Sequence, residues 1–160
     1  MTIVYFDSSA FVKLLVEEDG SDIAAALWDG CDAAVSSRLS YCEVRAALAA
    51  AGRDHRLELD AQQQAELAWE EYWAAVRPVE LTEPVAIHAG QLAGQHALRG
   101  ADAVHLASAL AVSADELLFA AWDQRLRSGV ESAGIAQAPA ADQVQPDGAV
   151  GADDVVSKPR

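Results

Sequence analysis

The sequence predicts an α/β fold in which a central parallel β-sheet is flanked by helices. Short apolar stretches with the composition of buried strands alternate with longer helical stretches along the chain. Such alternation is typical of parallel sheets that helices cover on both faces. Much of the 52% hydrophobic content is alanine, which favours closely packed helices. At 160 residues the chain is long enough for one domain with a substantial core.

Five short segments are expected to form strands. The first is a β-rich apolar run, and the third alternates directly after Pro78. Because a proline beside a strand is typical of a sheet edge, we place the third strand at an edge, and the last segment is expected to be an edge strand as well. The expected strands are residues 2–6, 32–36, 79–81, 116–120 and 135–137.

Capping residues indicate where the helices between these strands begin. Asp7 and the serines after it offer an N-cap for the first helix, and Gly20-Ser21-Asp22 begins the second. Thr82, with Pro84 in the first turn, begins another. Gly52 is expected to end the long helix before it. The remaining helices are expected over residues 37–51, 60–75, 82–99 and 102–113, with a short last helix from residue 123.

The bulk composition limits where the protein acts. No apolar run approaches the ~18 residues of a membrane span, and no signal peptide is evident, so we expect a cytoplasmic protein. Cys31 and Cys42 form no ligand motif and are expected to be buried thiols in a reducing compartment. The formal net charge of −14 argues against nonspecific nucleic-acid binding. This charge does not exclude a nucleic-acid substrate, because bound cations and a local arginine patch could offset it.

The chain is expected to divide into a domain over residues 1–138 and a tail over residues 139–160. Beyond residue 138 the composition shifts to Ala, Asp, Gly, Gln and Pro. Such a segment has little apolar surface to bury, so we expect a mobile tail.

Four acidic residues occupy positions suited to a metal-dependent enzyme: Asp7, Glu43, Asp102 and Asp123. Each lies where an apolar run gives way to a helix, or near the start of a helix. In a parallel sheet such junctions fall along the carboxyl ends of the strands, where open α/β sheets bind ligands. Four carboxylates gathered there would repel one another without a cation, and hard oxygen ligands suit Mg²⁺ or Mn²⁺.

Each acid also has a purely structural explanation. Asp7 and Asp123 could cap helices, and Asp102 could be favoured by a helix dipole in a first turn. Glu43 stands three residues after Ser40, the spacing of a capping box. These explanations do not account for the apolar helix faces that would hold Asp102 and Glu43 inward, where an isolated carboxylate is costly.

Other polar and aromatic residues are better explained by structure than by chemistry. His105 lies three residues after Asp102 on one helix face, and a hydrogen-bonded structural histidine is the favoured interpretation. Ser8 and Ser9 could support a metal or phosphate, although capping is the simpler role. The four tryptophans are expected in the core rather than as base-stacking platforms.

Four motifs together resemble those of PIN-domain ribonucleases, and specifically of VapC-type toxins. The first strand with residues 7–10 (DSSA) is similar to the first motif of the family, and residues 37–44, with Glu43, to the second. Residues 100–110 (GADAVHLASAL) are the most specific match, and residues 120–126 (AAWDQRL) resemble the fourth. The order and spacing of all four agree over most of residues 2–127.

The resemblance implies a PIN-like three-layer fold and Mg²⁺- or Mn²⁺-dependent endonucleolytic cleavage of RNA by metal-activated water. It also implies a cognate antitoxin and a homodimer. Carried over by position, Asp7, Glu43, Asp102 and Asp123 would be the catalytic acids, with Asp7 and Asp102 as direct metal ligands. Glu43 and Asp123 would bind metal directly or through water, or orient the nucleophile. Ala121 stands where family members often carry Ser or Thr, which puts the rate and metal preference in doubt.

Two other function classes fit parts of the pattern. A noncatalytic PIN-like module would bind metal or RNA without turnover. A phosphoacceptor receiver domain also gathers acids at a sheet edge, but it needs a late lysine, and none lies between Lys13 and Lys158. A phosphatase of the haloacid dehalogenase type would need a second aspartate where Ser9 stands.

Overall fold

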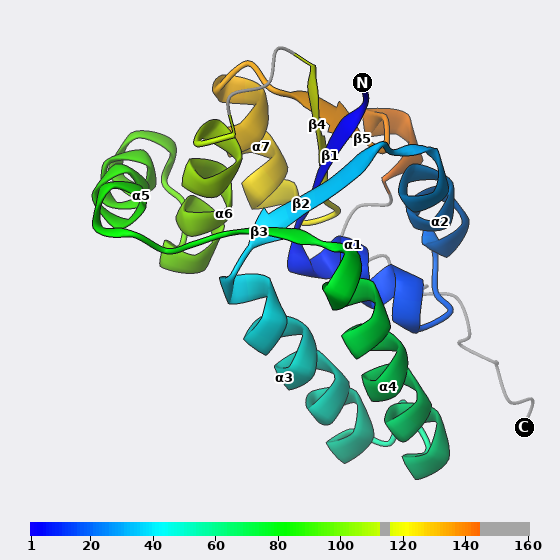
Figure 1. Ribbon diagram of the computed structural model, residues 1–160. Helices are drawn as coiled ribbons and strands as arrows, with labels where there is room; N and C mark the ends of the chain where they lie inside the picture. The colour runs from blue at the N-terminus through cyan, green and yellow to red at the C-terminus, as the bar shows by residue number, and fades with distance from the viewer. Residues whose placement is uncertain (113–115, 145–160) are drawn as a thin grey trace, which may run out of the picture.

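One parallel five-stranded sheet forms the centre of the protein, as the sequence predicts (Figure 1). The structure is a computed structural model, which describes residues 1–112 and 116–144. The strands lie in the order β3-β2-β1-β4-β5, and every neighbouring pair is parallel. Their bounds are β1 Ile3–Phe6, β2 Ala33–Ser37, β3 Arg77–Val79, β4 Leu117–Ala120 and β5 Ala136–Ala138.

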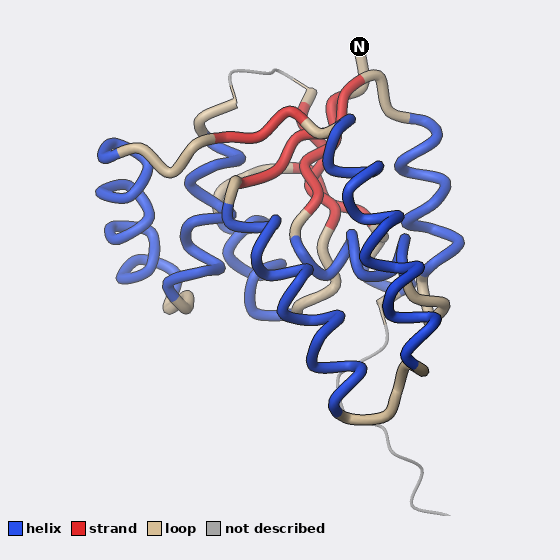
Figure 2. The backbone as a smooth tube through the Cα atoms, turned by 60° about the horizontal axis from the view of Figure 1, so that its bottom comes forward, coloured by secondary structure: helices blue, strands red, loops and turns tan. Residues whose placement is uncertain are grey.

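Helices cover both faces of this sheet, so the predicted three-layer arrangement is confirmed (Figure 2). On one face, Val4 and Phe6 of β1 join a core with α1 to α4, in which Trp69 is fully buried. On the other face, Tyr5 and Phe119 pack with α5, α6 and α7. The helices are α1 Ser8–Leu15, α2 Ser21–Gly30, α3 Leu39–Arg53, α4 Leu59–Ala75, α5 Glu83–His96, α6 Gly100–Leu110 and α7 Gln124–Ser132.

The strand register brings the carboxyl ends of β1, β2 and β4 to one edge. Ile3 of β1 pairs with Ala33 of β2 and with Leu117 of β4, and Phe6 lies opposite Ala120. The segments after β1, β2 and β4 therefore leave the sheet side by side. Such an edge is where an open α/β sheet binds its ligands.

Several predicted boundaries are shifted by tertiary contacts. The third strand covers Arg77–Val79 instead of residues 79–81, because these residues pair with the end of β2. Pro78 therefore lies within the edge strand, where a missing amide is tolerated. Gly52 does not end α3, which continues to Arg53, and His55 adopts the left-handed conformation (φ 56°) after it. The last two helices before β4 also end early, at His96 and Leu110.

The start of the predicted tail packs on the domain. Pro139 is fully buried, and its carbonyl oxygen accepts a hydrogen bond from the buried Arg127 at 2.8 Å. Arg127 also donates to the carbonyl of Ala121 at 2.8 Å, which ties the segment after β5 to the end of β4. A short 3₁₀ turn, Ala141–Gln143, follows. Residues 145–160 of the predicted tail lie outside the described part of the chain.

The two cysteines are free thiols, but the prediction that both are buried is wrong. Cys42 is exposed on α3, and Cys31 is partly buried after α2. Over residues 1–112 and 116–144, no helix has the length and apolar composition needed to cross a membrane.

We expect Gly20→Ala to destabilise the fold by about 1–3 kcal/mol. Gly20 precedes α2 with φ 88°, a conformation that disfavours alanine, and an added Cβ would lie 2.6 Å from Nε1 of Trp122. Gly30, the last residue of α2, has open space around its Cα, so Gly30→Ala is the matched control. Urea denaturation compares the variants, and equal midpoints for both would contradict the prediction.

Candidate active site

All four predicted acids occur near the carboxyl edge of the sheet. Asp7 directly follows β1 and is the N-cap of α1. Glu43 lies on α3, which follows β2. Asp102 stands in the first turn of α6, and Asp123 follows β4 as the N-cap of α7. Segments far apart in the sequence thus contribute one acid each to the same region.

Asp7 is a helix cap and also a buried carboxylate. Only 4% of its surface is exposed, and its Oδ1 accepts hydrogen bonds from the Ala10 amide (2.9 Å) and the Ser9 hydroxyl (2.7 Å). Ser9 in turn accepts a hydrogen bond from the Trp122 amide at 3.2 Å, which links the ends of β1 and β4. Among the described residues, no hydrogen bond reaches Oδ2 of Asp7. Capping explains one oxygen, and the other is free for a ligand.

Glu43 does not form the capping box that its spacing suggested. Its Oε2 accepts hydrogen bonds from Ser8 of α1 and from Nε2 of His105 on α6, the latter at 2.7 Å. Ser40 instead hydrogen-bonds the Ser36 hydroxyl at 2.7 Å, and the N-cap of α3 is Arg38, which makes no side-chain cap. Tertiary partners on two other helices have replaced the local contact.

His105 is a buried, hydrogen-bonded histidine, as predicted. Its Nδ1 lies 3.0 Å from the Tyr5 hydroxyl, and its exposed fraction is 3%. Ser8 was expected to cap a helix, but Asp7 caps α1 and Ser8 binds Glu43 instead. Sequence reasoning missed the role of Tyr5, because it looks like any aromatic residue in an apolar strand.

Asp102 carries an unpaired buried oxygen. Its Oδ2 is enclosed, and no described residue donates a hydrogen bond to it. A buried polar atom without a partner costs about 1–3 kcal/mol. Asp123 is half-buried, and its Oδ1 accepts from the Leu126 amide at 2.9 Å, so its predicted capping role is confirmed. A bound cation would supply the partner that Oδ2 of Asp102 lacks.

The four carboxylates interact electrostatically. Burial raises the pKa of Asp7 to about 6, and the charge of Glu43 contributes in the same direction while His105 opposes it. Burial also raises the pKa of Asp102, followed by repulsion from Asp123 and, less strongly, from Glu43. Burial acts upward on the pKa of Glu43 too, but the hydrogen bond and charge of His105, with Ser8, outweigh it and lower the pKa. Each acid therefore interacts electrostatically with at least one other acid of the cluster.

The donor set suits a hard divalent cation, although it does not form a finished coordination shell. Over the described residues, no three Asp, Glu, His or Cys side chains are already arranged around one position. The available ligands are carboxylate oxygens, the type that Mg²⁺ and Mn²⁺ prefer. The unpaired Oδ2 of Asp102 and the free Oδ2 of Asp7 are the atoms best suited to bind one.

A family model described as the PIN domain matches residues 4–128, most of the chain. The chain belongs to the PIN-domain family. Ribonucleases VapC45 and VapC49 of Mycobacterium tuberculosis are each 64% identical over 140 residues, which cover 88% of this chain and 97% of either relative. Ribonuclease VapC46 of the same species is 32% identical, over 85% of this chain and 96% of its own length. The chain is therefore a VapC-type ribonuclease, of the toxin class in toxin–antitoxin pairs.

Solved structures agree on the fold of this PIN domain. The crystal structure of M. tuberculosis VapC20, a toxin that cleaves the sarcin–ricin loop, superposes with a TM-score of 0.62 at 18% identity, covering 89% of this chain and 99% of that one. A toxin–antitoxin complex from Klebsiella pneumoniae gives 0.55 at 17% identity, covering 75% and 86%. These likenesses support the fold, and the family membership sets aside the receiver and dehalogenase-type alternatives.

Three of the arginines that the sequence suggested for a local patch are held by other groups of the protein. Arg38 pairs with Glu80, and Arg45 lies 3.5 Å from carboxylate oxygens of both Glu66 and Glu70. Arg127 is buried against backbone carbonyls. Arg99 differs from these three, because its charge acts on Asp102 of the acid cluster and lowers the pKa of that carboxyl, against the larger effect of burial.

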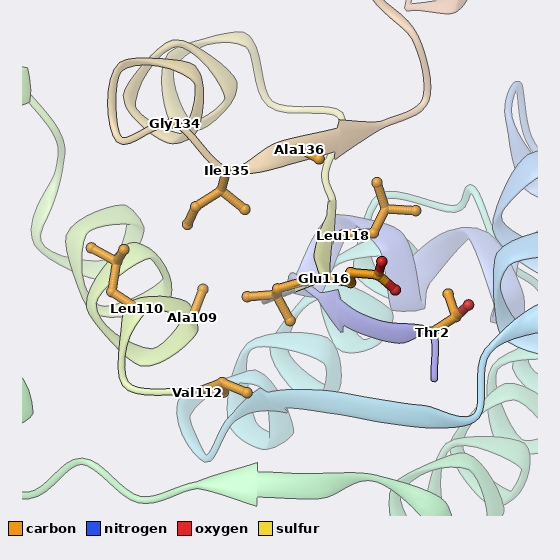
Figure 3. A pocket seen from close by; sticks show the side chains of 10 residues that line it. Thr2, Ala109, Leu110, Val112, Glu116, Leu118, Gly134, Ile135 and Ala136 are labelled. Carbon is orange, nitrogen blue, oxygen red and sulfur yellow. The ribbon is translucent and has the colours of Figure 1, made fainter. Parts of the chain in front are cut away.

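A cavity of about 780 Å³ lies at the opposite edge of the sheet (Figure 3). Its walls come from the start of β1 and β4, the end of α6 and the start of β5, and they are mostly apolar. It contains no group of converging charges. In this VapC-type ribonuclease the acid cluster, and not this cavity, is the candidate active site. The residues around the cavity are Thr2, Ala109, Leu110, Val112, Glu116, Leu117, Leu118, Gly134, Ile135 and Ala136.

Proposed function

We propose that this VapC-type ribonuclease hydrolyses RNA phosphodiester bonds at the cluster of Asp7, Glu43, Asp102 and Asp123, with Mg²⁺ or Mn²⁺ as cofactor. The observation that carries the proposal is the enclosed, unpaired Oδ2 of Asp102, which belongs to a carboxylate coupled to Asp123 and Glu43. A structural acid would be paired or solvated. An unpaired oxygen beside other carboxylates suits an electropositive ligand.

The four acids divide into two groups by their environment. Asp7 and Asp102 are the proposed direct ligands, because each has a buried or sheltered carboxylate with an oxygen that no described residue binds. Glu43 and Asp123 are each held by one oxygen and would bind the cation directly, through water, or orient the attacking water. When bound, the cation supplies a water molecule of lowered pKa and offsets the charge on the departing oxygen.

Water, not the 2′-hydroxyl of the RNA, is the proposed nucleophile. A cation held by the carboxylates would supply the attacking water, whereas attack by the 2′-hydroxyl with histidine as general base would need a free ring nitrogen. The histidine beside the acids, His105, has both ring nitrogens engaged, by Tyr5 and by Glu43. We propose that water attacks phosphorus and the 3′-oxygen departs, which leaves 5′-phosphate and 3′-hydroxyl ends and no 2′,3′-cyclic phosphate.

A cognate antitoxin is the proposed regulator. Structures similar in fold include toxin–antitoxin complexes, and the formal net charge of −14 would draw a basic protein segment towards the acidic edge. A lysine- and arginine-rich peptide is expected to inhibit cleavage, and inhibition should weaken with added salt because the attraction is electrostatic. A neutral peptide of the same length is the control. Equal inhibition by both peptides would contradict a charge-based blockade.

The homodimer and the cytoplasmic location are proposals of the same kind. Sedimentation velocity measures the first, and a monomer at all accessible concentrations would refute it. Free thiols at Cys31 and Cys42 are compatible with a reducing compartment.

Cleavage of an end-labelled RNA pool tests the proposed activity. Wild-type protein is incubated with Mg²⁺, with Mn²⁺ and with EDTA, and the fragment ends are identified chemically. We expect fragments only with a metal, carrying 5′-phosphates. Cyclic 2′,3′-phosphate ends, or equal cleavage in EDTA, would contradict the proposed chemistry. A folded protein that binds Mn²⁺ and RNA without cleaving any of the pool would support the noncatalytic PIN-like module instead.

A further inference from the structure

A chain of hydrogen bonds leads from the backbone of β2 to the carboxylate of Glu43. The Ser37 amide donates to the Tyr5 hydroxyl at 3.0 Å, and this hydroxyl lies 3.0 Å from Nδ1 of His105. Nε2 of His105 then lies 2.7 Å from Oε2 of Glu43. Ser37, Tyr5 and His105 are all buried. The proposed cleavage uses neither Tyr5 nor His105 directly.

The direction of each hydrogen bond follows from the two ends of the chain, a backbone amide that only donates and a carboxylate that only accepts. A backbone amide only donates, so the Tyr5 oxygen accepts from Ser37. The Glu43 carboxylate only accepts, so Nε2 of His105 carries a proton, and the neutral ring then accepts at Nδ1 from the Tyr5 hydroxyl. A neutral imidazole with an accepting Nδ1 carries its proton on Nε2. That proton faces Oε2 of Glu43.

We infer that Tyr5 and His105 are positioning residues that hold Oε2 of Glu43, so that its other oxygen faces the active site. The inference rests on the proposed function. Ser8 donates to the same Oε2 from the opposite helix, and among the described residues none donates to Oε1. Fixing one oxygen of a carboxylate while leaving the other free is how neighbouring groups orient a ligand or base.

Packing keeps this chain rigid. The Tyr5 ring stacks on Phe119, with 4.7 Å between centroids and 24° between planes. The His105 ring meets Tyr5 edge-on at 6.0 Å and 83°. Tyr5 lies on β1 and His105 on α6, and packing encloses both rings. The imidazole therefore cannot exchange its two nitrogens by rotating, and its hydrogen bonds determine which nitrogen carries the proton.

Tyr5→Phe removes the donor to Nδ1 while keeping the aromatic ring. The proton of His105 can then move to Nδ1, which turns a lone pair of Nε2 towards Glu43. We expect kcat to fall on the order of 10- to 100-fold. KM for RNA should change little, because both side chains are buried. Tyr72→Phe is the matched control, since no described hydrogen bond uses the Tyr72 hydroxyl.

Two substitutions of His105 separate hydrogen bonding from packing. His105→Gln places an amide N–H near the position of Nε2, so its kcat should stay within about tenfold of the wild-type value. In His105→Leu, which offers no donor, kcat should fall by the full 10- to 100-fold. His88→Gln, at an exposed position of α5, controls for the change in side chain. Equal loss in His105→Gln and His105→Leu would show that only packing matters and would overturn the inference.

Nitrogen-15 NMR of the imidazole rings provides a test that needs neither RNA nor metal. In EDTA, the neutral ring of His105 in the wild type is expected as the Nε2–H tautomer, and the neutral ring in Tyr5→Phe should show a mixture. A neutral ring protonated at Nδ1 alone in the wild type, or a wild-type kcat for folded Tyr5→Phe, would overturn the inference. Since the tautomer is read without turnover, this outcome is independent of whether the acid cluster cleaves RNA. If Tyr5→Phe does not fold, the inference is tested by the wild-type tautomer and by the kcat values of His105→Gln and His105→Leu.

Discussion

Asp7→Asn should abolish RNA cleavage while making the metal-free protein more stable at neutral pH. Replacing a residue that merely supports a metal ligand costs about 10–100-fold. Asp7 is a proposed metal ligand itself, so the fall in cleavage rate in Asp7→Asn should exceed that range. The amide keeps the shape and the helix cap, because asparagine caps as well as aspartate. Single-turnover cleavage under matched metal concentrations measures the loss.

The gain in stability follows from the raised pKa of Asp7. Burial raises this pKa from 3.8 in the unfolded chain to about 6 in the folded one. Between these values the folded state binds more protons, so the free energy of unfolding falls as pH rises through the window. An ionised Asp7 thus costs up to about 3 kcal/mol above pH 6. Asparagine removes this cost, and we expect a gain of about 1–3 kcal/mol at pH 7.5 and little near pH 4.

Urea denaturation in EDTA at both pH values measures the effect. Asp32→Asn, at an exposed position before β2, is a control for the loss of one negative charge. A destabilised Asp7→Asn at pH 7.5 would show that Asp7 serves the fold and would count against its role in the site. Wild-type cleavage by the same variant would refute its assignment as a catalytic residue.

Asp102→Asn should weaken Mn²⁺ binding by more than about 10-fold, the lower limit for residues that only support a metal ligand. The amide presents one oxygen without a negative charge, so the enclosed Oδ2 position no longer attracts a cation. Asp22→Asn is the matched control: Asp22 also stands in the first turn of a helix, α2, but is exposed.

Calorimetric titration with Mn²⁺ compares the two variants. If Asp102 serves only the helix dipole, both substitutions leave Mn²⁺ binding unchanged and cost a similar few tenths of a kcal/mol in stability. A specific loss of Mn²⁺ affinity in Asp102→Asn alone is the expected result.

The sequence predicted the sheet and the four acids because both are encoded locally. Strands such as Ile3–Phe6 are apolar runs followed at once by an acid and a helix start. Asp7 and Asp123 both cap helices, so their structural explanation is confirmed, and it is compatible with the metal-binding role proposed for them.

What the sequence could not show depends on contacts between distant segments. The spacing of Ser40 and Glu43 favoured a local capping box, but Glu43 binds Ser8 and His105, which are 35 and 62 residues away. Similarly, the third strand begins at Arg77 because the end of β2 pairs there, and no local pattern marks that pairing. Tyr5 acquires its role only when β1 meets α6.

An anomalous diffraction map from a crystal of the protein grown with Mn²⁺ tests the central claim most directly. We predict a peak at coordination distance from carboxylate oxygens of Asp7 and Asp102, with Glu43 or Asp123 in contact directly or through water. A protein that cleaves RNA with Mn²⁺ bound only elsewhere, and with these four carboxylates metal-free, would contradict it.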